Sequence, residues 1–221
     1  AEGKATVNYS YGGISRDYTV TVTAADPGGD KDPEVTKTLY VDDDAAENET
    51  QDGTSEHPFA TVQAAINHIN EQADKTDWTI EIRSGTYDRF VVSSGLDGLT
   101  VKAVKDEDVT IQTLNGNDID YTFSSGQPDV GGIQIMEADN VTFDGLTIEI
   151  GTETTLAHHM CAGISNHSES TKQADNFTIR NCEFVGNGDM TGQANGNVGI
   201  SISKFSSFTI EGCTFTNLME A

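Results

Sequence analysis

An eight-residue pattern occurs three times in the second half of the chain, at residues 141–148, 177–184 and 208–215. Each copy contains an apolar residue, Thr, an apolar residue, a polar residue, Gly or Asn, an apolar residue, a polar residue and an apolar residue. The alternation has the period of two that is typical of β-strands. The fifth position interrupts it with a residue that enters the left-handed region at low cost. Each copy is therefore predicted to form two short strands joined by a sharp bend.

A third strand is predicted before each copy, because the segments that begin at Gly132, Gly163 and Gly199 share a Gly-Ile start. Three strands then make one rung, and repetition of such rungs indicates a solenoid. The spacing between copies is unequal, so insertions are expected in loops while the strands keep their register. Residues 99–111 form a looser copy with Ala103 at the bend position, and we expect that rung to bend differently.

The pattern resembles the right-handed parallel β-helix of the pectate-lyase-like superfamily, over residues 38–221. A second block supports the resemblance: a Tyr-Val pair, an acidic loop and the residues 53–66 look like the opening of many bacterial β-helix proteins. The resemblance implies an all-β fold, a right-handed parallel β-helix whose N-terminal end is covered by an α-helix. It says little about activity, because one fold carries many functions.

The capping helix is also predicted directly from the residues. Thr61 is a suitable N-cap, and an apolar face at helical spacing follows it. That face consists of Val62, Ala65, Ile66 and Ile69. Downstream, residues 78–82 alternate as a strand, residues 84–87 are predicted to turn, and residues 89–92 form another strand.

Three segments are expected along the chain. Residues 1–25 alternate around a Gly-Gly pair and predict a β-hairpin, which resembles the last hairpin of a bacterial immunoglobulin-like domain. Residues 26–37 are rich in Pro, Gly and charge and predict a linker. Residues 38–221 form the β-helix. The chain ends without a capping element after the last rung, so we expect a C-terminally truncated β-helix from a longer chain with further domains.

The charge balance excludes several partners. Thirty-six acidic and 12 basic side chains give a formal net charge of −24. Such a charge argues against nucleic acid and anionic membrane surfaces as partners. No apolar run is long enough to span a bilayer, so no transmembrane segment is expected. The immunoglobulin-like resemblance implies a secreted or cell-surface location.

The cysteines are predicted to serve packing. Cys182 and Cys213 occupy the same column of successive copies, so their side chains are expected to stack inward as part of an apolar ladder. A disulfide between the two rungs and a metal site are the alternatives, and no Cys-x-x-Cys spacing supports a metal.

Three insertions, at residues 114–132, 151–175 and 186–197, come from neighbouring rungs and could border one groove. Loops usually carry the binding function of a solenoid. Tyr121 offers a platform on which a sugar ring could stack. Asp129, His158 and His159 are the other candidate substrate contacts. The two histidines could instead be ordinary loop residues or, with Cys161 and His167, metal ligands.

The acidic loop offers a candidate metal site at Asp42, Asp43 and Asp44. Carboxylate oxygens are the ligands that Ca²⁺ prefers. The loop lacks the spacing of an EF-hand, and a solvated acidic loop is the alternative.

These features predict an extracellular module of a bacterial surface or secreted protein that binds or processes polysaccharide. If it is an enzyme, the resemblance implies a polysaccharide lyase or a glycoside hydrolase. Carboxylates, Glu149 among them, occur near the predicted groove, but no lyase or glycosidase motif is present and no catalytic residue can be assigned. The column of Asp144, Arg180 and Glu211 has mixed signs and predicts a surface charge ladder. The alternative function is a non-catalytic adhesive or structural solenoid.

Overall fold

The computed structural model describes residues 3–11, 14–22, 37–45, 50–113, 121–122, 128–151, 161–166, 175–186, 197–202 and 206–218. The chain divides into two compact units, Ala1–Thr36 and Lys37–Ala221. The first unit is an antiparallel hairpin of β1 (Gly3–Tyr11) and β2 (Ile14–Val22), in which Tyr11 and Ile14 are partners. That register fits the predicted hairpin with two residues between its strands. The assignment to an immunoglobulin-like domain and the boundaries at residues 25 and 37 stay predictions.

The second unit consists of three parallel sheets, each built from strands of successive rungs. Sheet 1 contains β3 (Thr38–Val41), β4 (Thr79–Ile82), β7 (Thr100–Ala103), β11 (Thr142–Asp144), β14 (Phe177–Arg180) and β17 (Phe208–Glu211). Sheet 2 contains β5 (Gly85–Asp88), β8 (Val109–Gln112), β12 (Thr147–Glu149), β15 (Glu183–Val185) and β18 (Thr214–Thr216). Sheet 3 contains β6 (Val91–Val92), β10 (Pro128–Ile135), β13 (Cys161–Asn166) and β16 (Asn197–Ser201), and β9 (Tyr121–Thr122) pairs antiparallel with β10.

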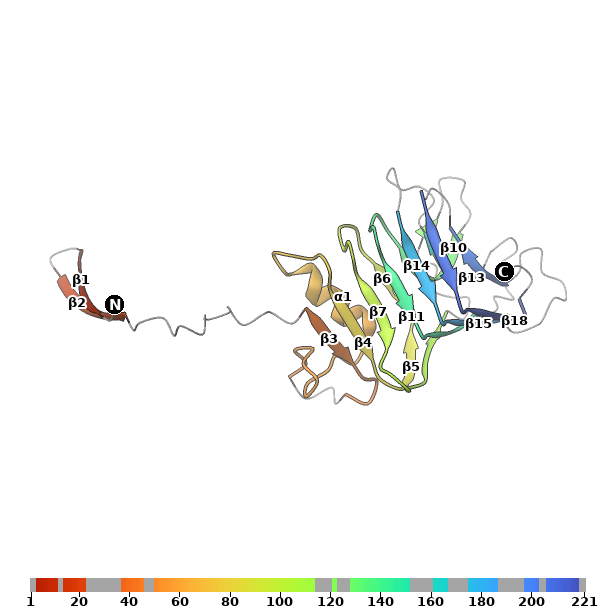
Figure 1. Ribbon diagram of the computed structural model, residues 1–221, viewed down its shortest axis with the longest axis horizontal. Coiled ribbons are helices and arrows are strands. Elements are labelled where there is room, and N and C mark those ends of the chain that lie inside the picture. Colours follow the sequence, from red (N-terminus) through yellow and green to blue (C-terminus); the bar gives the residue numbers. More distant parts are fainter. Residues whose placement is uncertain are drawn as a thin grey trace. The chain divides into compact units, whose positions relative to one another are not determined.

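The chain passes through sheets 1, 2 and 3 in turn and then returns to sheet 1 one rung further on. Figure 1 shows the strands of sheet 1 side by side, from β3 to β14. Neighbouring strands are in register; Thr142, for example, pairs with Thr100 on one side and Thr178 on the other. The predicted fold class, a right-handed parallel β-helix with an N-terminal capping helix, is confirmed.

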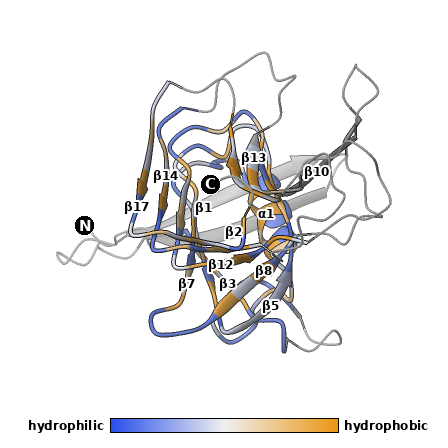
Figure 2. Ribbon diagram, turned by 90° about the vertical axis from the view of Figure 1, so that its right-hand side faces the viewer, coloured by the Kyte–Doolittle hydropathy of each residue, from blue (hydrophilic) through white to orange (hydrophobic). Residues whose placement is uncertain are grey.

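The core consists of inward columns that run from rung to rung. In sheet 1, Val101, Phe143 and Ile179 are fully buried register partners. In sheet 2, Phe184 stacks on Phe215 with ring centroids 4.9 Å apart and an interplanar angle of 5°. Figure 2 shows hydrophobic colour on strands of both sheet 1 and sheet 2, such as β14 and β8. Burial of these columns supplies the main favourable free energy of folding.

The two cysteines join this core, as predicted. Cys182 is buried and Cys213 is half-buried, and both are free thiols. Burial raises the pKa of the Cys182 thiol to about 12. The thiol therefore stays protonated at neutral pH and behaves as a small apolar group.

The single helix of the described residues, α1 (Val62–Asn70), begins and packs as the sequence predicts. The Thr61 side chain accepts a hydrogen bond from the Ala64 N–H at 3.1 Å, which is an N-cap. The predicted apolar face, Val62, Ala65, Ile66 and Ile69, is fully buried. The helix contacts β3, β4 and β6 at the N-terminal end of the coil (Figure 1). No helix of the described residues is long and apolar enough to cross a membrane.

The corner between sheets 1 and 2 is formed by the Gly/Asn position of the repeat. Gly145, Asn181 and Gly212 have φ angles of 72°, 53° and 62°, so each lies in the left-handed region. The rung with Ala103 at this position bends differently, as predicted: residues 104–108 form a longer connection in which Asp106 has the positive φ of 65°.

The prediction for the first rung was wrong in one detail. Residues 84–87 do not turn, because Gly85–Asp88 is strand β5 and pairs in register with β8. The glycine is required by a close approach: a Cβ atom at Gly85 would lie 2.3 Å from Oδ1 of Asp43. Tyr87 points inward and is buried, so the strand contributes to the core.

The corner between sheets 3 and 1 contains a ladder of aspartates that the sequence analysis did not identify. Oδ1 of Asp97 accepts a hydrogen bond from the Asp139 N–H, and Oδ1 of Asp139 accepts one from the Asp175 N–H, both at 2.9 Å. Oδ1 of Asp175 accepts one from the Ser206 N–H at the same distance. Each carboxylate therefore satisfies a backbone group of the next rung.

Candidate functional site

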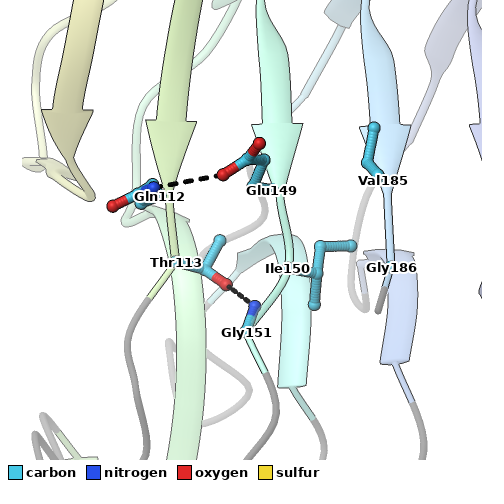
Figure 3. Close-up of a pocket in the computed structure, with 7 residues that line it drawn as sticks. All are labelled: Gln112, Thr113, Glu149, Ile150, Gly151, Val185 and Gly186. Carbon is cyan, nitrogen blue, oxygen red and sulfur yellow. Dashed lines mark hydrogen bonds between the residues drawn. The ribbon is translucent and has the colours of Figure 1, made fainter. Parts of the chain in front are cut away.

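The three predicted insertions leave the coil at the same corner, between sheets 2 and 3. Two of them are shorter than predicted at this corner, because residues 128–132 belong to β10 and residues 161–166 form β13. Thr113, Gly151 and Gly186 stand at the starts of the insertions, after β8, β12 and β15. All three residues line one pocket of about 290 Å³, whose other lining residues are Gln112, Glu149, Ile150 and Val185 (Figure 3). We call this site the insertion pocket.

The insertions also return to the coil side by side. Val130 of β10 pairs with Cys161 of β13, and Cys161 pairs with Asn197 of β16. Both ends of each insertion are therefore held in neighbouring rungs of the parallel sheets. The segments between these ends lie largely outside the described residues.

The polar groups of the insertion pocket come from strand periodicity. Ile148 and Ile150 point into the core, so Glu149 between them points outward and is exposed. Gln112 is its register partner on β8 and donates a hydrogen bond from Nε2 to Oε2 of Glu149 at 3.1 Å (Figure 3). Val185 is the partner on the other side and presents an apolar side chain.

The floor of the pocket is tied to the backbone. Thr113 is 6% exposed, and its hydroxyl oxygen accepts a hydrogen bond from the Gly151 N–H at 3.0 Å (Figure 3). The bond joins the starts of two insertions. The pocket thus presents one carboxylate and one amide next to apolar surface, an arrangement that can hydrogen-bond a hydroxyl-rich ligand.

A second polar feature lies on the outer face of sheet 3. Gln134, Ser165 and Ser201 are register partners on three successive strands. Their neighbours Ile133, Ile135 and Ile164 belong to the core, so the polar row faces away from it. Gln134 and Ser165 are nevertheless only 5% and 3% exposed. The Ser165 hydroxyl is buried and has no hydrogen-bond partner among the described residues, so a ligand or water could satisfy it.

The structure places two of the four predicted substrate contacts. Tyr121 of β9 and Asp129 of β10 are backbone partners in the antiparallel pair formed by the first insertion. Their side chains lie outside the described part of the structure. His158 and His159 belong to the second insertion and lie entirely outside the described residues. All four stay predictions.

The predicted metal residues do lie together. Ligand atoms of Asp42, Asp43 and Asp44 are within 4.8 Å of one another, which fits an oxygen-liganded cation by donor type. However, the Arg83 guanidinium pairs with Oδ2 of Asp42 at 3.0 Å, and the Thr86 N–H donates to Oδ2 of Asp43 at 2.8 Å. The protein therefore supplies partners for two of the three carboxylates, which favours the solvated-loop interpretation.

The outer face of sheet 1 contains the predicted charge ladder. Lys102 pairs with Glu81 at 2.9 Å, and Arg180 pairs with Asp144 at 2.8 Å. An open hollow of about 520 Å³ lies beside this ladder, between the long bend at residues 104–107 and the tight bends at Gly145 and Asn181. Asp144 in this hollow also accepts a hydrogen bond from the Asn181 amide at 2.9 Å. The charged groups of this ladder therefore pair with one another and do not indicate a ligand site.

Most residues of the insertion pocket were not singled out from the sequence. Glu149 was one of several carboxylates near the predicted groove, and Gln112 and Thr113 were not considered. A usable signal exists, because Gln112, Glu149 and Val185 are each the last outward residue of a strand before an insertion. The buried Ser165 hydroxyl has no such signal in the sequence.

Comparisons with known proteins give a fold and no family. No protein-family model matches the sequence, and no curated protein matches it. Among solved structures, the chain is similar to a GH136 lacto-N-biosidase from Eubacterium ramulus, with a TM-score of 0.58 and 13% sequence identity. The match covers 82% of this chain and 34% of the lacto-N-biosidase, so the chain spans about a third of that protein's length.

Two structures of a pectin methylesterase from Aspergillus niger also match, with TM-scores of 0.42 and 0.44 and identities of 14% and 15%. They cover 81% and 84% of this chain and 56% and 67% of theirs. At these identities the likeness to the lacto-N-biosidase supports the fold alone.

Proposed function

We propose that the β-helix unit binds polysaccharide at the insertion pocket, as a module of a secreted or cell-surface protein. The observation that carries this proposal is the convergence of three insertions on one pocket that contains Glu149 and Gln112. Sugars present many hydroxyl groups, and a carboxylate beside an amide offers both acceptors and donors for them. The name of the structural neighbour, a lacto-N-biosidase, adds support by analogy of fold only.

Processing of the bound glycan is the second candidate. Inverting glycosidases need two carboxyl groups about 6.5–9.5 Å apart. Among the described residues that line the pocket, Glu149 is the one carboxylate, since its register partners are Gln112 and Val185. A hydrolase would therefore need a second carboxylate from outside these lining residues. Asp88 lies two strands away in the same outward column, and the insertions contain Asp118, Asp120, Glu153 and Asp189.

Glycan-array screening of the full chain tests the proposal. We expect binding to a set of glycans, and we expect Glu149→Ala to weaken it at least tenfold. Glu211→Ala is the matched control, because Glu211 is an exposed glutamate on sheet 1. Binding by neither the parent chain nor the control would contradict the proposal and favour the structural solenoid. Analysis of the bound glycans for shortened products separates binding from processing.

A further inference from the structure

We infer that the insertion pocket selects uncharged glycans and rejects uronate-containing ones; this inference rests on the proposed function. The distribution of charge around the corner between sheets 2 and 3 supports it. A carboxylated sugar needs a cation beside it, usually an arginine or lysine, to offset its charge. The described residues supply almost none at this corner.

The outward columns of sheet 2 contain acidic and neutral residues. The column through the pocket consists of Asp88, Gln112, Glu149, Val185 and Thr216. The parallel outward column consists of Thr86, Thr110, Thr147, Glu183 and Thr214. Neither column contains a lysine or an arginine, so an anionic ligand on this face would meet Glu149 without a compensating charge.

The outer row of sheet 3 is uncharged as well. It consists of Val91, Gln134, Ser165 and Ser201. Gln134 and Ser165 are almost completely buried, and the Ser165 hydroxyl has no hydrogen-bond partner among the described residues. The row contains no lysine or arginine, so it adds no charge that could offset a carboxylate.

A basic residue of the described part, Arg89, lies one rung before the pocket. Its N–H donates to the Gln112 carbonyl oxygen at 3.1 Å, so it follows β5 where Thr113 follows β8. Arg89 makes a further interaction within the protein. An anionic ligand that binds Arg89 would depend on its guanidinium group, and Arg89→Gln tests this dependence.

The sequence of the insertions has the same bias. Between the strands of sheets 2 and 3, residues 114–127, 152–160 and 187–196 contain no lysine and no arginine. They do contain Asp118, Asp120, Glu153 and Asp189. With a net charge of −24 on the whole chain, long-range attraction of an anionic polymer is also absent.

The size of the discrimination follows from Coulomb's law. In bulk water, repulsion of about 1 kcal/mol from Glu149 would weaken the binding of a uronate carboxylate about 4 Å away roughly fivefold, and a partly desolvated site would weaken it further. Salt would screen the exposed part of this effect. We therefore expect at least tenfold weaker binding of a uronate oligosaccharide than of the same oligosaccharide with its carboxyl groups reduced to alcohols.

The experiment uses the full chain and matched ligands. Calorimetry in EDTA compares uronate oligosaccharides with their carboxyl-reduced forms, beside unrelated neutral oligosaccharides. Glu149→Gln removes the charge with little change in shape. We expect it to lower the ratio of the two dissociation constants, uronate over carboxyl-reduced, at least threefold. Glu211→Gln on sheet 1 is the control, and it should leave the discrimination unchanged.

The outcomes separate the inference from the function on which it rests. Tighter binding of the reduced form in EDTA, narrowed by Glu149→Gln, supports the inference. Equal or tighter binding of the uronate in EDTA, including binding that Arg89→Gln abolishes, overturns it and leaves the proposed function intact. Binding of the uronate that needs added Ca²⁺ also overturns it. Binding of no oligosaccharide of either kind contradicts the proposed function itself.

Discussion

Two corners of the same coil differ in the roles of their residues. At one corner the residues stabilise the fold, and at the other several residues have no evident structural role. The corner between sheets 1 and 2 turns within two residues at Gly145, Asn181 and Gly212. Around it, Asp144 bonds Arg180 and Asn181, and Cys182 fills the core. The corner between sheets 2 and 3 turns through three insertions and leaves Glu149 exposed beside a pocket.

The difference teaches where to look for function in this solenoid. A residue that the coil needs at every turn has the same role in every rung, so it repeats. A residue that serves a ligand has no reason to repeat, because one ligand contacts each rung differently. The repeated columns therefore describe stability, and the irregular corner holds the candidate site.

The largest expected effect concerns Gly163 of β13, the strand that follows the second insertion. A Cβ atom at Gly163 would lie 2.7 Å from the Gly199 carbonyl oxygen and 2.9 Å from Cδ1 of Phe184. Gly163→Val should therefore lower the free energy of unfolding by about 3 kcal/mol through overpacking. Urea unfolding followed by circular dichroism measures it.

Gly95→Ala is the control for this prediction, because a Cβ atom there has nothing within 4 Å and only the positive φ of 81° opposes it. It should cost about 1 kcal/mol. If the Gly163→Val protein is as stable as the Gly95→Ala protein, the backbone around Gly163 can shift to accommodate a side chain, and the predicted overpacking is wrong.

The next effect tests the tight corner. Gly145→Val should destabilise the protein by about 2 kcal/mol, because a β-branched residue is strained at a φ of 72°. Collision is not the cause, since the nearest atom to an added Cβ is Cβ of Ala103 at 3.5 Å. Gly145→Asn should be nearly neutral, because Asn181 occupies the equivalent position at 53°. Equal losses for Val and Asn would show that left-handed geometry does not define this corner.

A smaller effect emerges at alkaline pH. Burial raises the pKa of Cys182 from 9.0 to about 12 and that of Tyr87 from 10.0 to about 12. Because both folded-state pKa values are raised, the stability from the protonated groups is complete below pH 9. This stability is lost from pH 9 for Cys182 and from pH 10 for Tyr87, until pH 12. At pH 10, one unit above the ordinary pKa of Cys182, we expect a loss of about 1 kcal/mol.

Thermal unfolding between pH 7 and pH 11 checks this dependence, with Cys182→Ala as the comparison. The variant should be less stable at pH 7, because it leaves a small cavity, but its stability should fall less steeply above pH 9. Parallel pH profiles for the two proteins would contradict the assigned burial of Cys182 at the tight corner.

The smallest effect belongs to the exposed charge ladder on sheet 1. Asp144→Asn removes the ion pair with Arg180, whose two side chains are 22% and 41% exposed. Exposed and partly exposed pairs contribute little, so we expect a loss of about 0.5 kcal/mol. The loss should shrink further in 1 M NaCl, because salt screens such pairs. A loss above 2 kcal/mol, or one that salt does not reduce, would mean that this ladder carries more of the fold than its exposure indicates.

The coil itself could be predicted from local rules. The period of two marked the strands, and the Gly/Asn position marked the left-handed bends now seen at Gly145, Asn181 and Gly212. Thr61 marked the start of α1. Strand β5 was missed because Gly85 suggested a turn. The glycine is instead required because the Asp43 side chain, from 42 residues earlier in the chain, leaves no room for a Cβ atom.

The sequence by itself determined the rung, its bends, its inward columns and its capping helix, because each depends on conformational preferences and spacing within a few residues. Only the tertiary structure decided that Gln112, Glu149 and Val185 lie side by side and that three insertions begin around one pocket. It also decided that the Ser165 hydroxyl is buried and has no partner in the described part of the chain. These facts depend on which rungs become neighbours and in what register. Because the insertions differ in length, that register cannot be predicted from the spacing of residues along the chain.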